Sequence, residues 1–315
     1  MHWRIQKAFL KRSPVLWANM GKVSQILAHA FSTVSPPILI LSIPRSGSSW
    51  VGKILGLSST SLYLREPITQ TYLSHEKVNA LSVFEVTHRN LPSTYRASSA
   101  AAFIGLPIFR RDIINEHQKW FLLDRFRRRI VIKEVNPLSI RWIIDTYKPR
   151  IIYLIRHPAA VANSYFKLGW KRINFERRLS KETLDANNFN YGRFTYSFWA
   201  EHGIFQAAVL RLSLDALEKY KDFKIIKYED LCLRPLDTYQ MLYEFAGLNW
   251  SNWIEEGIVA QSTSQRPYRT GKYDLYRDSK VMVDKWKEDI NKRSIKQIKE
   301  SYLSLQPPYY SEEEW

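Results

Sequence analysis

The stretch that decides the fold is residues 38–50, which read ILILSIPRSGSSW. Its first four residues form an apolar run with the length of a buried strand. A turn with a proline, a glycine and several serines follows, and residues 50–57 then show the apolar spacing of a helix. A strand, a tight turn and a helix in this order predict the first unit of an α/β domain.

The turn at residues 44–50 has the composition of an anion-binding site. Gly47 permits a close backbone approach, and the N-terminus of the following helix supplies unpaired N–H groups. Ser48 and Ser49 add hydroxyl donors, and Arg45 adds a fixed positive charge. The turn therefore predicts a phosphate or sulfate site, with an ordinary serine-rich helix cap as the alternative.

The same segment comes close to a nucleoside-triphosphate loop. Gly47, Gly52 and Lys53 match the pattern G-x-x-x-x-G-K, but the next residue is Ile54 rather than the Ser or Thr that binds Mg²⁺. A P-loop kinase that acts on a small molecule is therefore the alternative function. No spacing of metal ligands appears along the chain, so no metal is expected.

Three further apolar runs predict strands at residues 130–132, 151–155 and 223–226. Helical patterns occupy residues 50–57, 137–147, 159–168, 194–220 and 236–246. This alternation predicts an α/β fold with a central, mainly parallel sheet flanked by helices, whose ligands bind at the carboxyl ends of the strands. Residues 68–128 and 169–193 are predicted to be irregular loops that bind the acceptor.

The composition excludes several classes of protein. The 315 residues are 45% hydrophobic and contain one cysteine, so a disordered chain and a disulfide framework are excluded. No apolar stretch approaches the roughly 18 residues of a membrane span. The net charge of +17 indicates an anionic partner, and nucleic acid is not expected because no nucleic-acid-binding motif appears.

The first 65 residues hold eight of the basic residues and no Asp or Glu. Residues 1–35 are assigned to a basic, helical N-terminal extension, and residues 36–315 to one domain. Residues 1–31 mix basic side chains with Trp and Leu. They either pack on the domain, which we favour, or make a peripheral contact with a membrane. No secretory signal is evident, so a cytoplasmic location is expected, with membrane association in the second case.

A second candidate anion site follows the strand at residues 151–155. That strand ends at Arg156, and Pro158 suits the first position of a helix. Ser164 lies on the second turn of this helix. The strand end and the helix therefore allow Arg156 and Ser164 to converge on one anion.

The two segments together resemble the PAPS-dependent sulfotransferase family, nearer its carbohydrate sulfotransferase branch, where PAPS is 3′-phosphoadenosine 5′-phosphosulfate. Residues 44–50 are similar to the family's 5′-phosphosulfate loop, and the strand with Arg156 and Ser164 is similar to its 3′-phosphate motif. Residues 227–248 and 279–287 are similar to two further family segments. Arg269-Thr270-Gly271 weakly resembles an Arg-Lys-Gly segment that cytosolic members of the family have near the 3′-phosphate.

The resemblance implies a P-loop-like sulfotransferase fold and in-line transfer of a sulfuryl group from PAPS to a hydroxyl, on a glycan or a glycolipid. Trp50 would stack on adenine, and Arg45 stands where many cytosolic members have Lys. The donor-binding residues that it implies are Arg45, Ser46, Gly47, Ser48, Ser49, Trp50, Arg156 and Ser164.

Glu66 is the first candidate for the general base that accepts the acceptor's proton. It lies in Leu64-Arg65-Glu66-Pro67, which resembles a Glu-Pro segment of carbohydrate sulfotransferases, and Pro67 biases it away from a helix. A simple salt bridge with a neighbouring Arg is the alternative.

Glu134 is the second candidate base, because Lys133-Glu134 stands where cytosolic members carry a His. Arg45, assisted by Lys53 or Lys133, would stabilise charge on the leaving phosphate. His88 and His157 are weaker candidates. The aromatic and His side chains offered to a sugar are Tyr72, His75, His88, Tyr95, Trp170, Phe189 and Tyr191.

Overall fold

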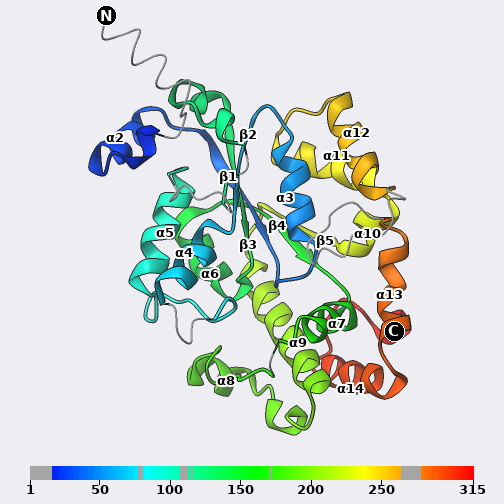
Figure 1. Cartoon of the computed structure of the whole chain (residues 1–315). Coiled ribbons are helices and arrows are strands. Elements are labelled where there is room, and N and C mark those ends of the chain that lie inside the picture. The colour runs from blue at the N-terminus through cyan, green and yellow to red at the C-terminus, as the bar shows by residue number, and fades with distance from the viewer. Residues whose placement is uncertain (1–15, 77–80, 107–112, 115, 171, 264–277) are drawn as a thin grey trace, which may run out of the picture.

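The computed structural model describes residues 16–315 apart from 77–80, 107–112, 115, 171 and 264–277. Its sheet has the strand order β2-β3-β1-β4-β5, and every neighbouring pair is parallel (Figure 1). The strands are β1 (Val34–Leu41), β2 (Ser61–Arg65), β3 (Arg129–Glu134), β4 (Arg150–Ile155) and β5 (Phe223–Lys227). The predicted parallel α/β sheet is confirmed.

Helices surround this sheet on both faces (Figure 1). The α-helices are α2 (Lys22–Ala30), α3 (Ser48–Gly56), α4 (Pro67–Glu76), α5 (Ser93–Phe103), α6 (Ile140–Tyr147), α7 (Pro158–Lys167), α8 (Lys181–Asn187), α9 (Phe198–Leu217), α10 (Tyr228–Leu233), α11 (Pro235–Ala246), α12 (Asn252–Ser262), α13 (Val281–Asp289) and α14 (Lys292–Leu303). Short 3₁₀ turns are η1 (Leu16–Asn19), η2 (His117–Trp120), η3 (Leu122–Arg127), η4 (Pro137–Ser139), η5 (Tyr191–Phe194) and η6 (Glu312–Glu314).

The alternation of side chains along the central strand divides the core into two layers. Leu39 and Leu41 face a cluster that includes residues of α5, α6 and α9. Ile38 and Ile40 face a second cluster built with α3, α11 and α12. Both faces of the sheet are therefore apolar, which explains why its strands read as continuous apolar runs.

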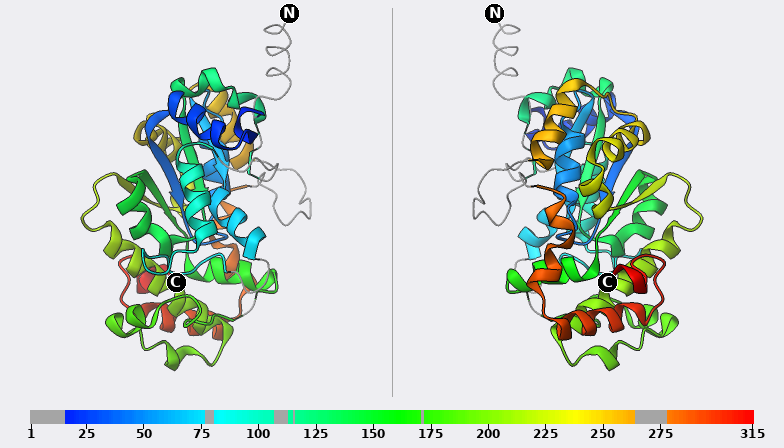
Figure 2. Two further views of the ribbon diagram at one scale, coloured as in Figure 1. Left: turned by 90° about the vertical axis from the view of Figure 1, so that its left-hand side faces the viewer. Right: turned by 90° about the vertical axis from the view of Figure 1, so that its right-hand side faces the viewer.

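Helices α9 and α14 lie in the lower part of the molecule, beyond the carboxyl ends of the strands (Figure 1). Helix α14 packs along α9 (Figure 2). At Gly203 a Cβ atom would lie 2.5 Å from the carbonyl oxygen of Ile298, so only glycine permits this approach. No helix among the described residues is long and apolar enough to cross a lipid bilayer.

All four strands and five helices that the sequence predicts are present in the structure. The structure also contains β2, which the sequence analysis does not predict. It is five residues long and carries Tyr63 and Arg65 between its apolar positions. A short alternating segment of this kind gives a weak periodic signal. Because β2 pairs with β3, this omission also hid which residues lie beside the end of β3.

The prediction that residues 68–128 and 169–193 are irregular is wrong. Helices α4 and α5 lie in the first stretch, and α8 lies in the second. Helix α4 carries polar residues through most of its length, and α5 consists largely of Ala and Ser. Neither sequence has the apolar spacing by which a helix is recognised, so tertiary packing decides both.

The position of β1 in the sheet fixes the position of the anion-binding turn. Strand β1 lies between β3 and β4, so the turn that follows it emerges at the middle of the carboxyl edge. The end of β3 brings Lys133 to one side of this turn, and the end of β4 brings Arg156 to the other. Ligands of open parallel sheets bind at such a point.

Candidate active site

The turn after β1 is shaped by two residues with left-handed backbone. Gly47 is the N-cap of α3 with φ 95°, and a Cβ atom there would lie 2.4 Å from the ring of Tyr228. Arg45 has φ 69°, a conformation that costs free energy for a residue with a side chain. The hydroxyl of Ser42 donates to that of Ser48 at 2.8 Å, which holds the first turn of α3. The turn is thus a strained, closely supported cradle at a helix N-terminus.

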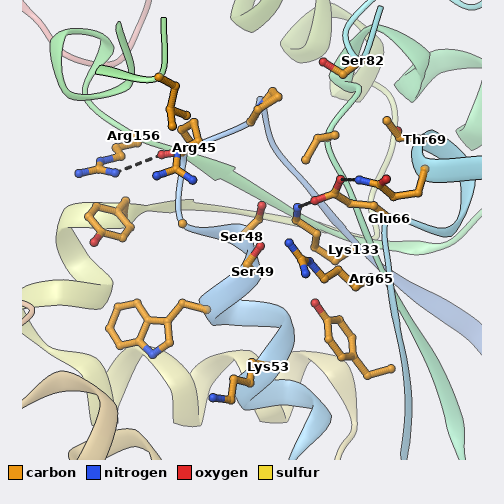
Figure 3. A pocket seen from close by; sticks show the side chains of 18 of the residues that line it. Arg45, Ser48, Ser49, Lys53, Arg65, Glu66, Thr69, Ser82, Lys133 and Arg156 are labelled. Carbon is orange, nitrogen blue, oxygen red and sulfur yellow. Dashed lines mark hydrogen bonds and ion pairs between the residues drawn. The ribbon is translucent and has the colours of Figure 1, made fainter. Parts of the chain in front are cut away.

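Two arginines meet beside this cradle. The Arg45 Nε donates to the Ser164 hydroxyl at 2.8 Å, and an Arg156 N–H donates to the Arg45 carbonyl oxygen at 3.1 Å. The Arg156 guanidinium lies over the ring of Tyr228, 4.2 Å from its centroid. Three predicted donor-binding residues, from the segment after β4, from α7 and from the turn, are therefore brought together, as Figure 3 shows for the two arginines.

A buried ion pair lies on the other side of Ser48 and Ser49 (Figure 3). The Lys133 ammonium contacts the Glu66 carboxylate, and their side chains are 3% and 12% exposed. The second Glu66 oxygen accepts from the Gln70 amide at 3.0 Å. The predicted base thus pairs with a lysine from the neighbouring strand rather than with an Arg, and both carboxylate oxygens have a donor.

Glu66 occupies the junction between β2 and α4. Its backbone is left-handed with φ 51°, and its N–H donates to the Lys133 carbonyl oxygen at 2.6 Å. Helix α4 begins at Pro67, so Glu66 lies just outside the helix, as we predicted from the proline that follows it. A strained, non-glycine residue held by a neighbouring strand is frequent at functional sites.

Glu66 is ionised at neutral pH. Burial alone raises the pKa of Glu66, but the charge and hydrogen bond of Lys133, together with Gln70, outweigh burial and hold that pKa below its ordinary value. The carboxylate is therefore in the form that accepts a proton.

Glu134 is placed differently from Glu66, although both were candidates for the base. Its carboxylate is fully buried and accepts from the Ile68 N–H at 2.7 Å and from the Thr69 hydroxyl at 2.6 Å. It thus caps the N-terminus of α4 from the neighbouring strand. Glu134 does not line the pocket described below, and its hydrogen bonds position α4.

The pKa of Glu134 predicts a pH-dependent stability. Burial raises this pKa from 4.5 to about 7, so the folded protein holds a proton that the unfolded chain releases above pH 4.5. The contribution of Glu134 to stability therefore falls as pH rises from about 4.5 to 7, by on the order of 3 kcal/mol. Relative to Glu134→Gln, the free energy of unfolding of the wild type should fall across this range, as urea titrations would show.

The control for this titration is Glu76→Gln, at the exposed end of the same helix. It should retain the fall in the free energy of unfolding that the wild type shows between about pH 4.5 and 7. Parallel curves for the wild type and Glu134→Gln would contradict a raised pKa at Glu134.

The cradle with its two arginines and the Glu66–Lys133 ion pair line the same pocket. Its volume is about 450 Å³, which is ordinary for a ligand site. The predicted residues on its wall are Arg45, Gly47, Ser48, Ser49, Trp50, Lys53, Glu66, Lys133 and Arg156. Ser46 and Ser164 lie behind the wall, and Ser164 takes part only through Arg45.

The pocket also contains residues that the sequence did not single out for it. Tyr228, which lies in the segment 227–248, contacts both Gly47 and Arg156. Gln70 and Gln261 are the others of note. Gln70 lies one turn after Glu66, a spacing that signals contact only once α4 is known to be a helix.

Several other candidates lie away from the pocket. His157 is stacked on Trp286 at 4.3 Å, and burial lowers its pKa to about 3. Tyr95 and Phe189 are core residues, and His88 lies near Asp145 on the surface. Of the seven side chains offered to a sugar, Trp170 alone lines the pocket. Arg269-Thr270-Gly271 lies outside the described residues.

Unpartnered polar atoms concentrate at this pocket. Eight buried side-chain nitrogen or oxygen atoms of the described residues have no hydrogen-bond partner. Four of them belong to pocket-lining residues, namely Trp50, Tyr63, Arg156 and Gln261. A fifth is the hydroxyl of Ser46 in the cradle. Such atoms are costly to bury, so the side chains around this cavity carry hydrogen-bonding groups that the protein alone does not satisfy.

Comparison with known proteins places the chain among sulfotransferases. A family model described as a sulfotransferase domain matches residues 35–305. Carbohydrate sulfotransferase 5 of Mus musculus is 22% identical over 318 residues, which cover 84% of this chain and 77% of that protein.

Two solved structures are also similar. One is the sulfotransferase domain from the curacin biosynthetic pathway, with a TM-score of 0.47 and 19% identity over 88% of this chain and 100% of that one. The other is mouse sulfotransferase SULT7A1 complexed with PAP, with a TM-score of 0.42 and 15% identity over 89% and 84% of the two chains.

Proposed function

This chain belongs to the sulfotransferase domain family and transfers a sulfuryl group from PAPS to a hydroxyl-bearing acceptor, and we propose that the acceptor is a carbohydrate of a glycan or a glycolipid. The observation that carries the proposal is the position of Glu66. An ionised, buried carboxylate faces the anion cradle across one pocket, where a base must stand to receive a proton from a hydroxyl.

The residues around the pocket fit the donor. Arg156 and Arg45, which are joined by the hydrogen bond from Arg156 to the Arg45 carbonyl oxygen, would hold the phosphate groups, and the N-terminus of α3 would bind the sulfuryl end. Trp50 lines the same pocket, and its indole ring would stack on adenine.

The transfer is an in-line displacement. The acceptor oxygen forms a bond to sulfur while the bond from sulfur to the phosphate oxygen breaks, and the phosphate leaves with that electron pair. Glu66 would take the acceptor's proton, because its carboxylate is held in place by Lys133 and Gln70. Lys133 also adds positive charge near the transferred group, as Arg45 does from the other side.

A carbohydrate acceptor has three supports. The curated relative is named a carbohydrate sulfotransferase. The proposed base is the carboxylate of Glu66, in a segment that resembles the Glu-Pro segment of carbohydrate sulfotransferases. Trp170 lines the pocket, is 42% exposed, and stacks on Tyr165 at 4.5 Å, so a fixed aromatic face is open to a sugar ring.

Thermal shift distinguishes this function from the P-loop kinase. Adenosine 3′,5′-bisphosphate (PAP) should raise the melting temperature by several degrees at saturation, because it binds only the folded protein. ATP with Mg²⁺ should leave it nearly unchanged, since Ile54 is fully buried at the position where a kinase has a hydroxyl. A large shift with ATP and Mg²⁺ and none with PAP would overturn the assignment of the donor.

A further inference from the structure

Arg65 is a charged residue of the pocket wall that has no task in the transfer derived from the cradle, Glu66 and Lys133. It is the last residue of β2, is partly buried and lines the pocket. Its backbone is fixed by the pairing of β2 with β3, and its N–H donates to the Ile113 carbonyl oxygen at 2.9 Å. The side chain of Arg65 therefore extends from a firmly held position at the carboxyl edge of the sheet.

The alternation of side chains along β2 turns Arg65 toward α3. Leu62 and Leu64 belong to the first core cluster, whereas Tyr63 packs against the second cluster, which contains residues of α3. Because side chains alternate along a strand, Arg65 projects on the same face as Tyr63. Lys133 is the partner of Arg65 in the register of β2 and β3, so these two cations share the face that α3 covers.

The guanidinium of Arg65 reaches the anion cradle. Figure 3 shows its side chain directed toward Ser49, in the first turn of α3. The positive end of the helix dipole lies at this turn. Arg65 thus approaches the cradle from β2, whereas Arg45 and Arg156 meet on the other side of it.

The charge of Arg65 is not neutralised by a carboxylate of its own. Within the described part of the chain, no hydrogen bond or ion pair joins its guanidinium to another side chain, and the Glu66 carboxylate is paired with Lys133. Burial lowers the pKa of Lys133, and the charge of Arg65 acts in the same direction. Repulsion between two cations at one wall costs free energy, which an anion bound between them would offset.

The direction of Arg65 favours the donor over the acceptor as the source of this anion. Arg65 is aimed at the helical turn that would bind the phosphosulfate. The Glu66 carboxylate, which would meet the acceptor's hydroxyl, is turned to Lys133 and Gln70 instead. An anion in contact with Arg65 is therefore the phosphosulfate end of the nucleotide.

We propose that Arg65 is a further catalytic residue, which binds the phosphosulfate end of PAPS from the side of β2 and stabilises charge on the leaving phosphate. The proposal rests on the proposed function in one respect, because the acceptor's proton moves to Glu66. Two cations and one carboxylate, namely Arg65, Lys133 and Glu66, carry one net positive charge before the transfer and two once Glu66 is protonated. Positive charge thus increases while the phosphate gains the electron pair of its bond to sulfur.

Calorimetry with three nucleotides tests this contact on the full-length protein without an acceptor. Arg65→Gln should weaken PAP by about tenfold to a hundredfold, the value of a hydrogen bond to a charged group. PAPS should lose less, because its 5′-phosphate has not yet gained the charge that develops in the transfer. Adenosine 3′-monophosphate lacks the 5′ group and should bind nearly as it does to the wild type.

Turnover and two further variants complete the test. Arg65→Gln should lower kcat with PAPS by about 10²–10³ and leave the KM of the acceptor nearly unchanged. Arg65→Lys keeps the charge without the planar fork, so it should recover part of both losses. Arg141→Gln is the matched control, since Arg141 is exposed on α6 and lies outside the pocket. It should bind and turn over like the wild type.

Three results would overturn the proposal. An unchanged affinity for PAP in Arg65→Gln would mean that the side chain does not touch the phosphate. An equal loss for all three nucleotides would mean that Arg65 only supports the shape of the pocket, and an increase confined to the KM of the acceptor would place its anion on the acceptor. The binding experiment involves neither the acceptor nor its proton. Near-normal turnover of Glu66→Gln would therefore contradict the proposed base and leave the nucleotide result for Arg65 as it stands.

Discussion

Glu66→Gln is expected to lower kcat by about 10²–10⁴, which is the usual contribution of general base catalysis. The substitution keeps the size of the side chain and an oxygen for the Gln70 amide, but it removes the group that accepts a proton. Donor binding should be nearly unchanged, because the cradle and the two arginines lie on the other side of Ser48 and Ser49. Steady-state kinetics with PAPS and calorimetry with PAP measure the two effects separately.

The Glu66→Gln substitution removes the ion-pair partner of Lys133. Burial lowers the pKa of Lys133, and Glu66 opposes that effect. Without the carboxylate, Lys133 is left buried without its partner, which is costly unless it releases its proton. We therefore expect the variant to be less stable than the wild type, and circular dichroism must show that it is folded at the assay temperature.

Glu76→Gln is the control for the kinetic experiment, since it makes the same chemical change at an exposed position of α4. It should have wild-type turnover. A folded Glu66→Gln protein that binds PAP and turns over at a near-normal rate would remove Glu66 from the role of base, and the ion pair with Lys133 would then be structural.

Arg156→Ala is expected to weaken PAP binding by about tenfold to a hundredfold, the value of a hydrogen-bonded contact with a charged group. The loss should be specific for the 3′-phosphate. Adenosine 5′-monophosphate lacks that phosphate, so its affinity should change little. The wild-type preference for PAP over adenosine 5′-monophosphate, measured by calorimetry, should therefore largely disappear.

Two further variants support the interpretation. Arg156→Lys keeps the charge but loses the planar fork over Tyr228, so it should recover only part of the preference. Arg234→Ala removes an exposed arginine that pairs with Asp230, and it should bind both nucleotides like the wild type. An equal loss of affinity for both nucleotides in Arg156→Ala would instead mean that Arg156 supports the Arg45 backbone and does not read the 3′-phosphate.

The anion cradle could be predicted because its signal is local. The strand, Gly47 and the helix N-terminus follow one another within a few residues, and each is dictated by backbone geometry that neighbouring residues set. The same reasoning found Arg156 and Ser164, which lie eight residues apart at a strand end and on the next helix. The apolar runs likewise predicted a buried parallel sheet with ligands at its carboxyl edge.

The two carboxylates show where local reasoning ends. Glu66 and Glu134 were both candidates, and one-dimensional patterns could not rank them on geometry. Neighbours in a strand point to opposite faces, so Lys133 and Glu134 cannot share a surface, but the direction of each depends on how β3 lies in the sheet. The pairing of β2 with β3 sets Arg65 opposite Lys133 and thereby places Glu66 beside the ammonium.

The sequence by itself determined four strands of the sheet, the turn after β1 and the arginine that follows β4, because strands and helix N-termini are set by short-range periodicity and backbone sterics. Only the tertiary structure decided that Lys133 pairs with Glu66, that Glu134 caps α4 and that Tyr228 supports the arginine. These contacts join residues about 65 to 72 positions apart, and such pairs are selected by sheet register and the packing of whole helices.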